Sequence, residues 1–297
     1  MSSNETFDLF LIDASVDFSH PDGSLYVPGA YDDAIRTAHL IANLGIAKKQ
    51  HCCIERIFFA MDAHHPMDIT HPIWWFQSGS KKFPPLFTTM VFSDGEVVGV
   101  DLEGAHRFYT AAIPELMRAG GPHRGGTVGV MSALQTLGTG ITIWPEHNII
   151  GTPGQAVVQP IRTTIRNWEM VTGRHVRWKF KGQSPWTEHH GAFAAQIHLE
   201  DDPSTHYDTD LYDEMAFGGR RKLVAGQAST HCVIQTMDQM LDHPDPDPRN
   251  PSITPEMIVM LTDTMSPVPG HEERWTAFRD TWEPRGMTFC TTEDIQR

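Results

Sequence analysis

The chain has 297 residues, and a hydrophobic content of 40% is ample for a buried core in one large or two modest domains. Its 23 Lys and Arg against 37 Asp and Glu give a net charge of -14, which repels phosphate groups and argues against nucleic acid or an anionic membrane as a partner. The four cysteines lack Cys-x-x-Cys spacing, and no signal peptide or membrane span is visible, so we expect a cytoplasmic protein.

The first part of the chain predicts a strand, a helix and a second strand. Residues 7–13 form a short apolar run that ends in an acid, as a central parallel strand does, and residues 54–61 repeat this pattern before Asp62. Between them, residues 31–49 place Ala, Ile and Leu at helical spacing. The pattern is therefore βαβ, with an acid at the tip of each strand.

Residues 72–126 interrupt this alternation and are interpreted as an insertion in a single domain over residues 1–297. Within it, Asp94-Gly95 between two β-prone arms predicts a hairpin over residues 87–100, and a helix is expected over about 104–119. The insertion is either a lid or a contact surface for another subunit. The apolar residues that would form such an interface are Trp74, Trp75 and Phe76.

The remainder of the chain again alternates helices and strands. In order, we expect a helix at 154–172, a strand at 176–181, a polar surface segment at 201–214, a strand near 223–226, a helix that contains Cys232, a loop at 243–255, a strand at 257–262, a helix at 272–282 and an edge strand at 287–290. This order predicts an α/β fold with a largely parallel sheet and helices on both faces.

Cys232 lies where a buried strand, a tight turn and the first turn of a helix follow one another. Unpaired backbone N–H groups at a helix N-terminus favour a thiolate and can also stabilise an oxyanion. A free cysteine is, however, more often a small buried core residue. Partners are needed to favour the reactive interpretation.

Those partners are predicted at the carboxyl ends of other strands. Asp13, Asp62, Lys181 and the turn before Cys232 would share one edge of a parallel sheet, the edge where such sheets bind ligands. Taken singly, the acids could be turn formers and the lysine a solvated charge. Together, a carboxylate that accepts the thiol proton and a lysine that stabilises anions suit acyl transfer through a thioester.

A second cluster combines Asp62 and His64 with the distant His147. Two histidines and one carboxylate form a metal set that leaves coordination positions open for water or substrate. The chain has 17 histidines, so chance pairs are common and spacing alone does not decide the matter.

Five segments resemble the motifs of the nicotinamidase and isochorismatase-like cysteine hydrolases. In chain order they are Leu-Ile-Asp at 11–13 with Asp17-Phe18, Asp-Ala-His at 62–64, Trp-Pro-Glu-His at 144–147, the Lys-Gly block from Lys181 to Phe193, and the nucleophile loop at 226–232. The resemblance runs from residue 11 to residue 236 and implies an isochorismatase-like fold, a Rossmann-like three-layer sandwich.

For catalysis, the resemblance implies a triad in which Cys232 is the nucleophile, Asp13 its base and Lys181 the third member. It also implies a cis peptide between Gln227 and Ala228, which would make the amides of Ala228 and Cys232 the oxyanion hole.

For the pocket, the resemblance implies that Phe18 and Trp144 hold a planar ring between them, and His190 is expected to line the pocket or the surface. The complete set of Asp62, His64 and His147 favours the metal-binding, nicotinamidase-like branch, with zinc favoured and iron or manganese as alternatives. A fourth protein ligand is not assigned, because the further histidine of many members falls here at Thr70 or His71.

The expected reaction is hydrolysis of a small planar carboxamide to an acid and ammonia, and a homo-oligomer is expected because such assemblies are common in the family. One alternative is an amidase of the same family that acts on another amide, such as a ureido or maleamate-like acid. A second alternative is a protein that binds a small molecule, or assembles with partners, without catalysis. The aromatic residue often found before the nucleophile is replaced by His231, which leaves the substrate more open than the reaction.

Overall fold

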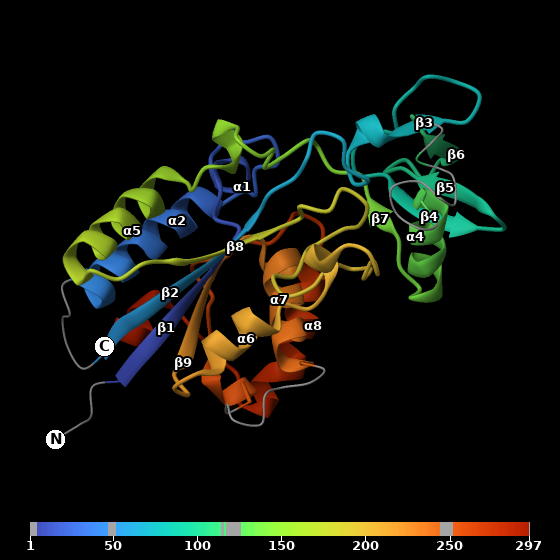
Figure 1. The fold of residues 1–297 in the computed structure, drawn as a ribbon. Coiled ribbons are helices and arrows are strands. Elements are labelled where there is room, and N and C mark those ends of the chain that lie inside the picture. Colours follow the sequence, from blue (N-terminus) through green and yellow to red (C-terminus); the bar gives the residue numbers. More distant parts are fainter. Residues whose placement is uncertain (1–4, 47–51, 114–115, 117–125, 244–251, 297) are drawn as a thin grey trace.

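The computed structural model describes residues 5–46, 52–113, 116, 126–243 and 252–296 (Figure 1). Six parallel strands form the main sheet in the order β11-β10-β9-β1-β2-β8. Their bounds are β1 Glu5–Ile12, β2 Cys52–Asp62, β8 Arg177–Lys181, β9 Arg221–Gly226, β10 Ile258–Leu261 and β11 Thr288–Cys290. The predicted α/β class with a large parallel sheet is confirmed.

Helices cover both faces of this sheet and make the fold a three-layer sandwich (Figure 1). On one face lie α2 (Ala30–Leu40), its π-helical continuation Ile41–Ile46 and α5 (Gln159–Thr172). On the other face lie α6 (Thr209–Ala216), α7 (Ile234–Leu241) and α8 (Glu272–Trp282). The short helices are α1 (Val16–Ser19) and α9 (Thr292–Gln296).

Strand β1 explains why both faces need cover. Its side chains alternate, so that Phe7, Leu9 and Leu11 pack with α2 and α5, while Phe10 and Ile12 pack with the helices opposite. All five are almost fully buried. A strand that is apolar on both faces is typical of the centre of a parallel sheet, and β1 has that position.

A second sheet of five strands lies beside the main one, in the order β3-β6-β5-β4-β7 with antiparallel pairing (Figure 1). Its elements are β3 (Trp75–Gln77), β4 (Thr89–Ser93), β5 (Glu96–Val100), β6 (His106–Ala111) and β7 (Ile141–Thr142), with helix α4 (Gly126–Thr136) packed on it. The predicted hairpin is confirmed. Ser93 pairs with Glu96 around Asp94 and Gly95, whose φ angles are +52° and +86°.

Two expectations for the insertion are wrong. The helix expected over 104–119 is replaced at His106–Ala111 by strand β6, because Tyr109 and Ala111 alternate into the core of the second sheet. Trp74 and Trp75 are 1% and 0% exposed, so they belong to the core under α4 and do not offer surface to another subunit, whereas Phe76 is partly exposed.

Other boundaries differ from the expected ones. The second sheet extends to Thr142, past the expected end of the insertion near residue 126. Helix α5 begins at Gln159 rather than near 154. The segment expected to be polar surface contains α6, whose Leu211 and Tyr212 are buried. The expected ends of helices at 47–49 and 117–119, and most of the loop at 243–255, lie outside the described residues.

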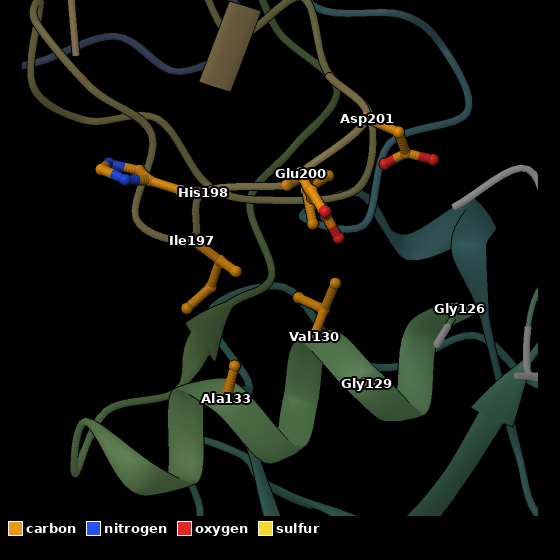
Figure 2. A pocket seen from close by; sticks show the side chains of 9 residues that line it. Gly126, Gly129, Val130, Ala133, Ile197, His198, Glu200 and Asp201 are labelled. Carbon is orange, nitrogen blue, oxygen red and sulfur yellow. The ribbon is translucent and has the colours of Figure 1, made fainter. Parts of the chain in front are cut away.

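A cavity of about 490 Å³ lies between α4 and residues 197–201. Figure 2 shows Val130 and Ala133 projecting from α4 toward Ile197, while Gly126 and Gly129 leave the helix backbone as part of the wall. None of the residues expected to carry chemistry lines it. Among the described helices, none is both long and apolar enough to cross a membrane.

Candidate active site

The polar side chains at the strand ends are brought together as one group. Asp62 and Lys181 are register partners on β2 and β8, and the backbone N–H of Asp13 donates to the carbonyl of Ala60 at 2.9 Å. The carboxylate of Asp13 in turn accepts from the N–H of Asp62 at 2.8 Å. On the other side of β1, Gly226 has a φ of +129°, and a Cβ there would lie 1.9 Å from the carbonyl oxygen of Ile12. Only glycine permits this approach.

Lys181 is the centre of the group. Its Nζ lies 2.8 Å from Asp13 Oδ2, 2.5 Å from Asp62 Oδ1, 3.0 Å from the carbonyl of His189 and 3.8 Å from Cys232 Sγ. The side chain is fully buried, so these partners replace water around the ammonium. A thiol, two carboxylates and a lysine in contact are suited to acyl transfer.

The protonation states differ from the expectation of a resting thiolate. Burial raises the pKa of Cys232 well above its ordinary value; Lys181 acts to lower it, while Asp13 and Asp62 act to raise it further. Burial, together with Asp62, raises the pKa of Asp13 to about 7. Burial opposes the charge of Lys181, but Asp13 and Asp62 raise its pKa well above the ordinary value. The raised pKa favours the thiol form of the resting sulfur, and the carboxyl group of Asp13 lies beside it.

Hydrogen bonds to a residue on α2 hold the segment that carries the thiol. The peptide between Gln227 and Ala228 is cis, which confirms that expectation, and π-helical Ser229–Val233 follows and leads into α7. The side chain of Gln227 donates to Asp33 Oδ2 at 2.9 Å, and Ser266 donates to the same oxygen at 2.6 Å. Asp33 is 4% exposed. A buried carboxylate on α2 thus holds the loop in which Cys232 lies.

The expected metal set also converges. One ligand atom each from Asp62, His64 and His147 lies within 4.8 Å of the others, and all three side chains are buried. The Nδ1 of His64 lies 3.1 Å from Asp68 Oδ2, and that of His147 lies 2.7 Å from the carbonyl of Pro145. In both rings Nδ1 faces an oxygen acceptor, so Nε2 is the nitrogen that is turned toward Asp62.

His71 lies next to this set, although the sequence did not assign it as a ligand. Its Nδ1 lies 3.3 Å from the carbonyl of Pro66, and its ring centre lies 5.5 Å from those of both His64 and His147. Its Nε2 is buried without a hydrogen-bond partner. Three imidazole nitrogens and one carboxylate oxygen are a donor set that suits zinc and other first-row divalent ions.

The charges of Asp62, His71 and His147 also fit a cation, whereas Asp62 and Asp68 raise the pKa of His64 well above its ordinary value, so that ring would have to lose a proton to bind a metal. Burial alone would raise the pKa of Asp62, but the charges of Lys181 and His64 hold it well below the ordinary carboxylate range. Burial, with the neighbouring His64, lowers the pKa of His147 well below its ordinary value. Burial also lowers the pKa of His71. The carboxylate is thus ionised and these two imidazoles are neutral, the forms that bind metal.

A cavity of about 520 Å³ opens above the thiol. Cys232, Asp62 and His147 lie on its floor, and the expected substrate residues Phe18, Trp144 and His190 all line it. The ring of Phe18 is 5.2 Å from that of His147. The indole N–H of Trp144 donates to Glu188 Oε2 at 3.2 Å, which fixes the plane of the ring. Ala228 of the expected oxyanion hole also lines the cavity.

No protein-family model matches this sequence, and no curated protein is significantly similar to it. Solved structures do match over nearly the whole chain. The yeast nicotinamidase Pnc1p has 17% identity and a TM-score of 0.58, covering 96% of this chain and 99% of its own. A nicotinamidase and pyrazinamidase from Acinetobacter baumanii has 15% identity and a TM-score of 0.58, covering 99% and 98%. PnC1 from L. infantum, in complex with nicotinate, has 17% identity and a TM-score of 0.52, covering 99% and 95%.

This chain has the fold of the nicotinamidases. Within that fold, sequence reasoning did not assign several residues that line the cavity. Glu188 and His271 line the cavity, as does His231, which was noted only as a departure. The rings of His190 and His271 lie 5.8 and 5.0 Å from that of His231. The position of His231 beside the nucleophile was a usable signal. The sequence contains no comparable signal for Glu188 and His271, because they reach the cavity through loops that fold over the edge of the sheet.

Proposed function

We propose that this protein is an amidohydrolase that converts a small planar carboxamide of the nicotinamide type to an acid and ammonia through a thioester on Cys232. The observation that carries the proposal is the position of Lys181 between Asp13 and Asp62, with Cys232 Sγ 3.8 Å from its ammonium. All four groups are buried at the base of a cavity that aromatic side chains line.

In the first half of the reaction, Asp13 accepts the proton of the Cys232 thiol and the sulfur attacks the amide carbon. The carbonyl oxygen takes the negative charge, and the amides of Ala228 and Cys232 are its proposed donors. Asp13 has a pKa raised to about 7, so it can accept a proton at neutral pH and also return it. Lys181 remains protonated and stabilises the negative charges around it.

In the second half, Asp13 donates its proton to the amide nitrogen, the carbon–nitrogen bond breaks, and ammonia leaves. A water molecule then attacks the thioester carbon and gives a proton to Asp13. The carbon–sulfur bond breaks, Cys232 recovers the proton, and the acid is released. Each proton thus passes through one carboxylate, and the enzyme ends in its starting state.

Asp62, His64, His71 and His147 are the residues that would hold a divalent metal, with zinc favoured and iron or manganese as alternatives. Such an ion supplies Lewis acidity and a fixed position for a polar group of the substrate or for water. Asp68 would hold the ring of His64 in the required orientation, since its carboxylate lies 3.1 Å from Nδ1.

Phe18 and Trp144 are proposed to contact the faces of the substrate ring. Both line the cavity and are 7% exposed, so a planar ligand between them would complete a largely buried aromatic stack. Structures with the same fold support this choice of ligand: yeast Pnc1p is bound to the inhibitor nicotinaldehyde, and the L. infantum protein is in complex with nicotinate.

The test is ammonia release from nicotinamide by purified protein of known metal content, with Cys232→Ala beside it. Wild type is expected to release ammonia and nicotinate in equal amounts, and Cys232→Ala to lose at least about 1,000-fold in kcat because the nucleophile is gone. The variant should keep its circular dichroism spectrum and metal content. If Cys232→Ala retained most of the activity, the thioester mechanism would be wrong.

A further inference from the structure

The cavity above Cys232 extends beyond the reacting groups, and the second sheet forms its outer part. The volume of about 520 Å³ lies in the range of roughly 300–1,000 Å³ that is typical of pockets for drug-sized ligands. A carboxamide with a single ring occupies only part of this space. The side chains that the second sheet contributes are Phe87, Thr89, Leu102 and Thr142.

The pairing of β4 with β7 directs two of these side chains into the cavity. Thr89 and Thr142 are cross-strand partners, so they emerge on the same face of the sheet, and both line the cavity. The adjacent partners Met90 and Ile141 are 0% and 1% exposed in the core of the second sheet. Alternation along the strands therefore gives one face to that core and the opposite face to the cavity.

Phe87 is held at the junction of the second sheet with the aromatic wall. Its φ is +65°, a conformation that bulky residues rarely adopt, and its N–H donates to the carbonyl of Ile143 at 2.6 Å. Its ring lies 5.9 Å from that of Trp144, nearly perpendicular to it. Leu102, beyond the end of β5, is 79% exposed. These two side chains offer apolar surface at the outer end of the cavity.

The buried triad decides which end of a substrate can reach this surface. Asp13 and Lys181 are at most 1% exposed and lie beneath the cavity floor, where the leaving nitrogen must receive its proton. A large amine would therefore have to enter the buried side of Cys232, whereas an acyl group attached to the sulfur can extend along the cavity that Cys232 lines. Any bulk in the substrate therefore belongs to the acyl group.

We propose that the preferred substrate is a primary carboxamide whose acyl group carries a second, apolar ring that binds between Phe87 and Leu102. This inference rests on the amidohydrolase function proposed above and specifies its substrate class. It gives the second sheet a role as the outer wall of the substrate site.

The experiment compares kcat/KM for nicotinamide with kcat/KM for a nicotinamide that carries a phenyl group on the ring carbon meta to the carboxamide. In wild type, the phenyl-substituted amide should be preferred by roughly 10-fold or more, the effect of filling an apolar subsite. Nicotinamide with a benzyl group on the amide nitrogen should not be hydrolysed. Leu102→Ala should reduce the preference several-fold. Leu137→Ala should leave it unchanged, because Leu137 is 58% exposed on the second-sheet side and does not line the cavity.

Equal or poorer hydrolysis of the phenyl-substituted amide, or a preference that Leu102→Ala does not alter, would overturn the inference. Binding of the two corresponding acids by titration calorimetry separates this failure from failure of the proposed function. In one outcome neither amide is hydrolysed, but wild type binds the phenyl-substituted nicotinate roughly 10-fold more tightly than nicotinate and Leu102→Ala does not. The subsite then stands and the proposed reaction is wrong. If the amides are hydrolysed but the two acids bind equally, the reaction stands and the subsite is wrong.

Discussion

At the scale of single residues, the acceptor on each Nδ1 atom distinguishes the three histidines of the candidate metal site. His64 faces the carboxylate of Asp68, whereas His71 and His147 face the backbone carbonyls of Pro66 and Pro145. A carboxylate makes the imidazole a stronger donor than a carbonyl does, so His64 is expected to be the strongest of the three ligands.

Removing one ligand tests the set. In His147→Ala, zinc affinity should fall by at least about 100-fold, and in His71→Ala by roughly 10-fold or more, because each loses an Nε2 donor that is already oriented. His65→Ala is the matched control, since His65 is exposed next to His64 and is absent from the cavity lining. The affinities are measured by titration calorimetry on metal-free protein. Equal zinc affinity in His147→Ala and His65→Ala would remove His147 from the site.

At the scale of elements, α2 has two structural roles: its apolar side packs on the sheet, and Asp33 on the same helix holds the loop that carries Cys232. Arg36 pairs with the other oxygen of that carboxylate at 2.7 Å. Both carboxylate oxygens are thus occupied, and Gln227 and Ser266 would lose a buried partner if Asp33 were truncated.

Asp33→Ala is expected to lower the free energy of unfolding by about 1–3 kcal/mol through these unpaired groups. As Asp33 is a positioning residue, kcat should also fall while KM changes little, because the loop that carries Cys232 loses its restraint. Asp32→Ala, an exposed neighbour on the same helix, is the control. Urea unfolding and steady-state kinetics provide the two measurements. A loss of stability with an unchanged kcat would leave Asp33 a purely structural role.

The opposite end of the main sheet carries a buried ionic cluster that is separate from the cavity. Asp8, 0% exposed, pairs with Arg56 at 2.6 Å, with Arg220 at 2.9 Å and with buried Lys222 at 3.8 Å. Burial lowers the pKa of Lys222 to about 8, even though Asp8 acts to raise it. Within the described part of the chain, Arg56, Arg220 and Lys222 therefore share the carboxylate of Asp8.

Asp8→Asn should lower the free energy of unfolding by about 3–5 kcal/mol, because it leaves buried cations without their counter-charge. Glu283→Gln, which removes the acid of the exposed Arg279 pair, should change stability by less than about 1 kcal/mol. Both are measured by urea unfolding. Since the cluster lies far along β1 from Asp13, kcat per folded molecule should stay at the wild-type value; a large loss of kcat would show that the two ends of the sheet are coupled.

At the scale of the whole molecule, the chain contains two adjoining sheets with separate cores. The second core includes Trp75, Met90 and Met131. Ile69 and Trp186, which lie outside the strands of the second sheet, pack in the same core. The cytoplasmic location and the homo-oligomer stay predictions, and the burial of Trp74 and Trp75 removes two of the three residues first suggested for subunit contact.

Trp75→Ala tests whether the two sheets open as separate units. In this variant, the free energy that protects the amides of β3 to β7 from hydrogen exchange should fall by roughly 3–5 kcal/mol, the range for truncation of a fully buried aromatic side chain. The amides of β1, β2 and β9 should keep their protection. Ile73→Ala, at a position 40% exposed, should alter neither sheet. Hydrogen exchange followed by mass spectrometry measures both regions. Equal loss of protection in both sheets would mean that the molecule unfolds as one unit.

The sequence by itself determined the main sheet and most of the site at its edge. Asp13, Asp62 and Lys181 could be located because each ends a predicted strand, and the end of a parallel strand has a fixed place in the sheet. The same local logic identified the turn before Cys232 and the hairpin at Asp94-Gly95. Those features depend on a few neighbouring residues, so a single sequence contains them.

Only the tertiary structure decided the role of the inserted segment and the outer half of the cavity. Strand β6 looked helical because its pairing with β3 and β5 comes from residues far along the chain, and the direction of Thr89 and Thr142 follows from a register that no local pattern sets. The unpartnered Nε2 of His71 and the approach of Glu188 likewise depend on loops folding over the sheet edge. Long-range pairing and loop packing are properties of the folded chain as a whole, and for that reason the substrate subsite became visible only in three dimensions.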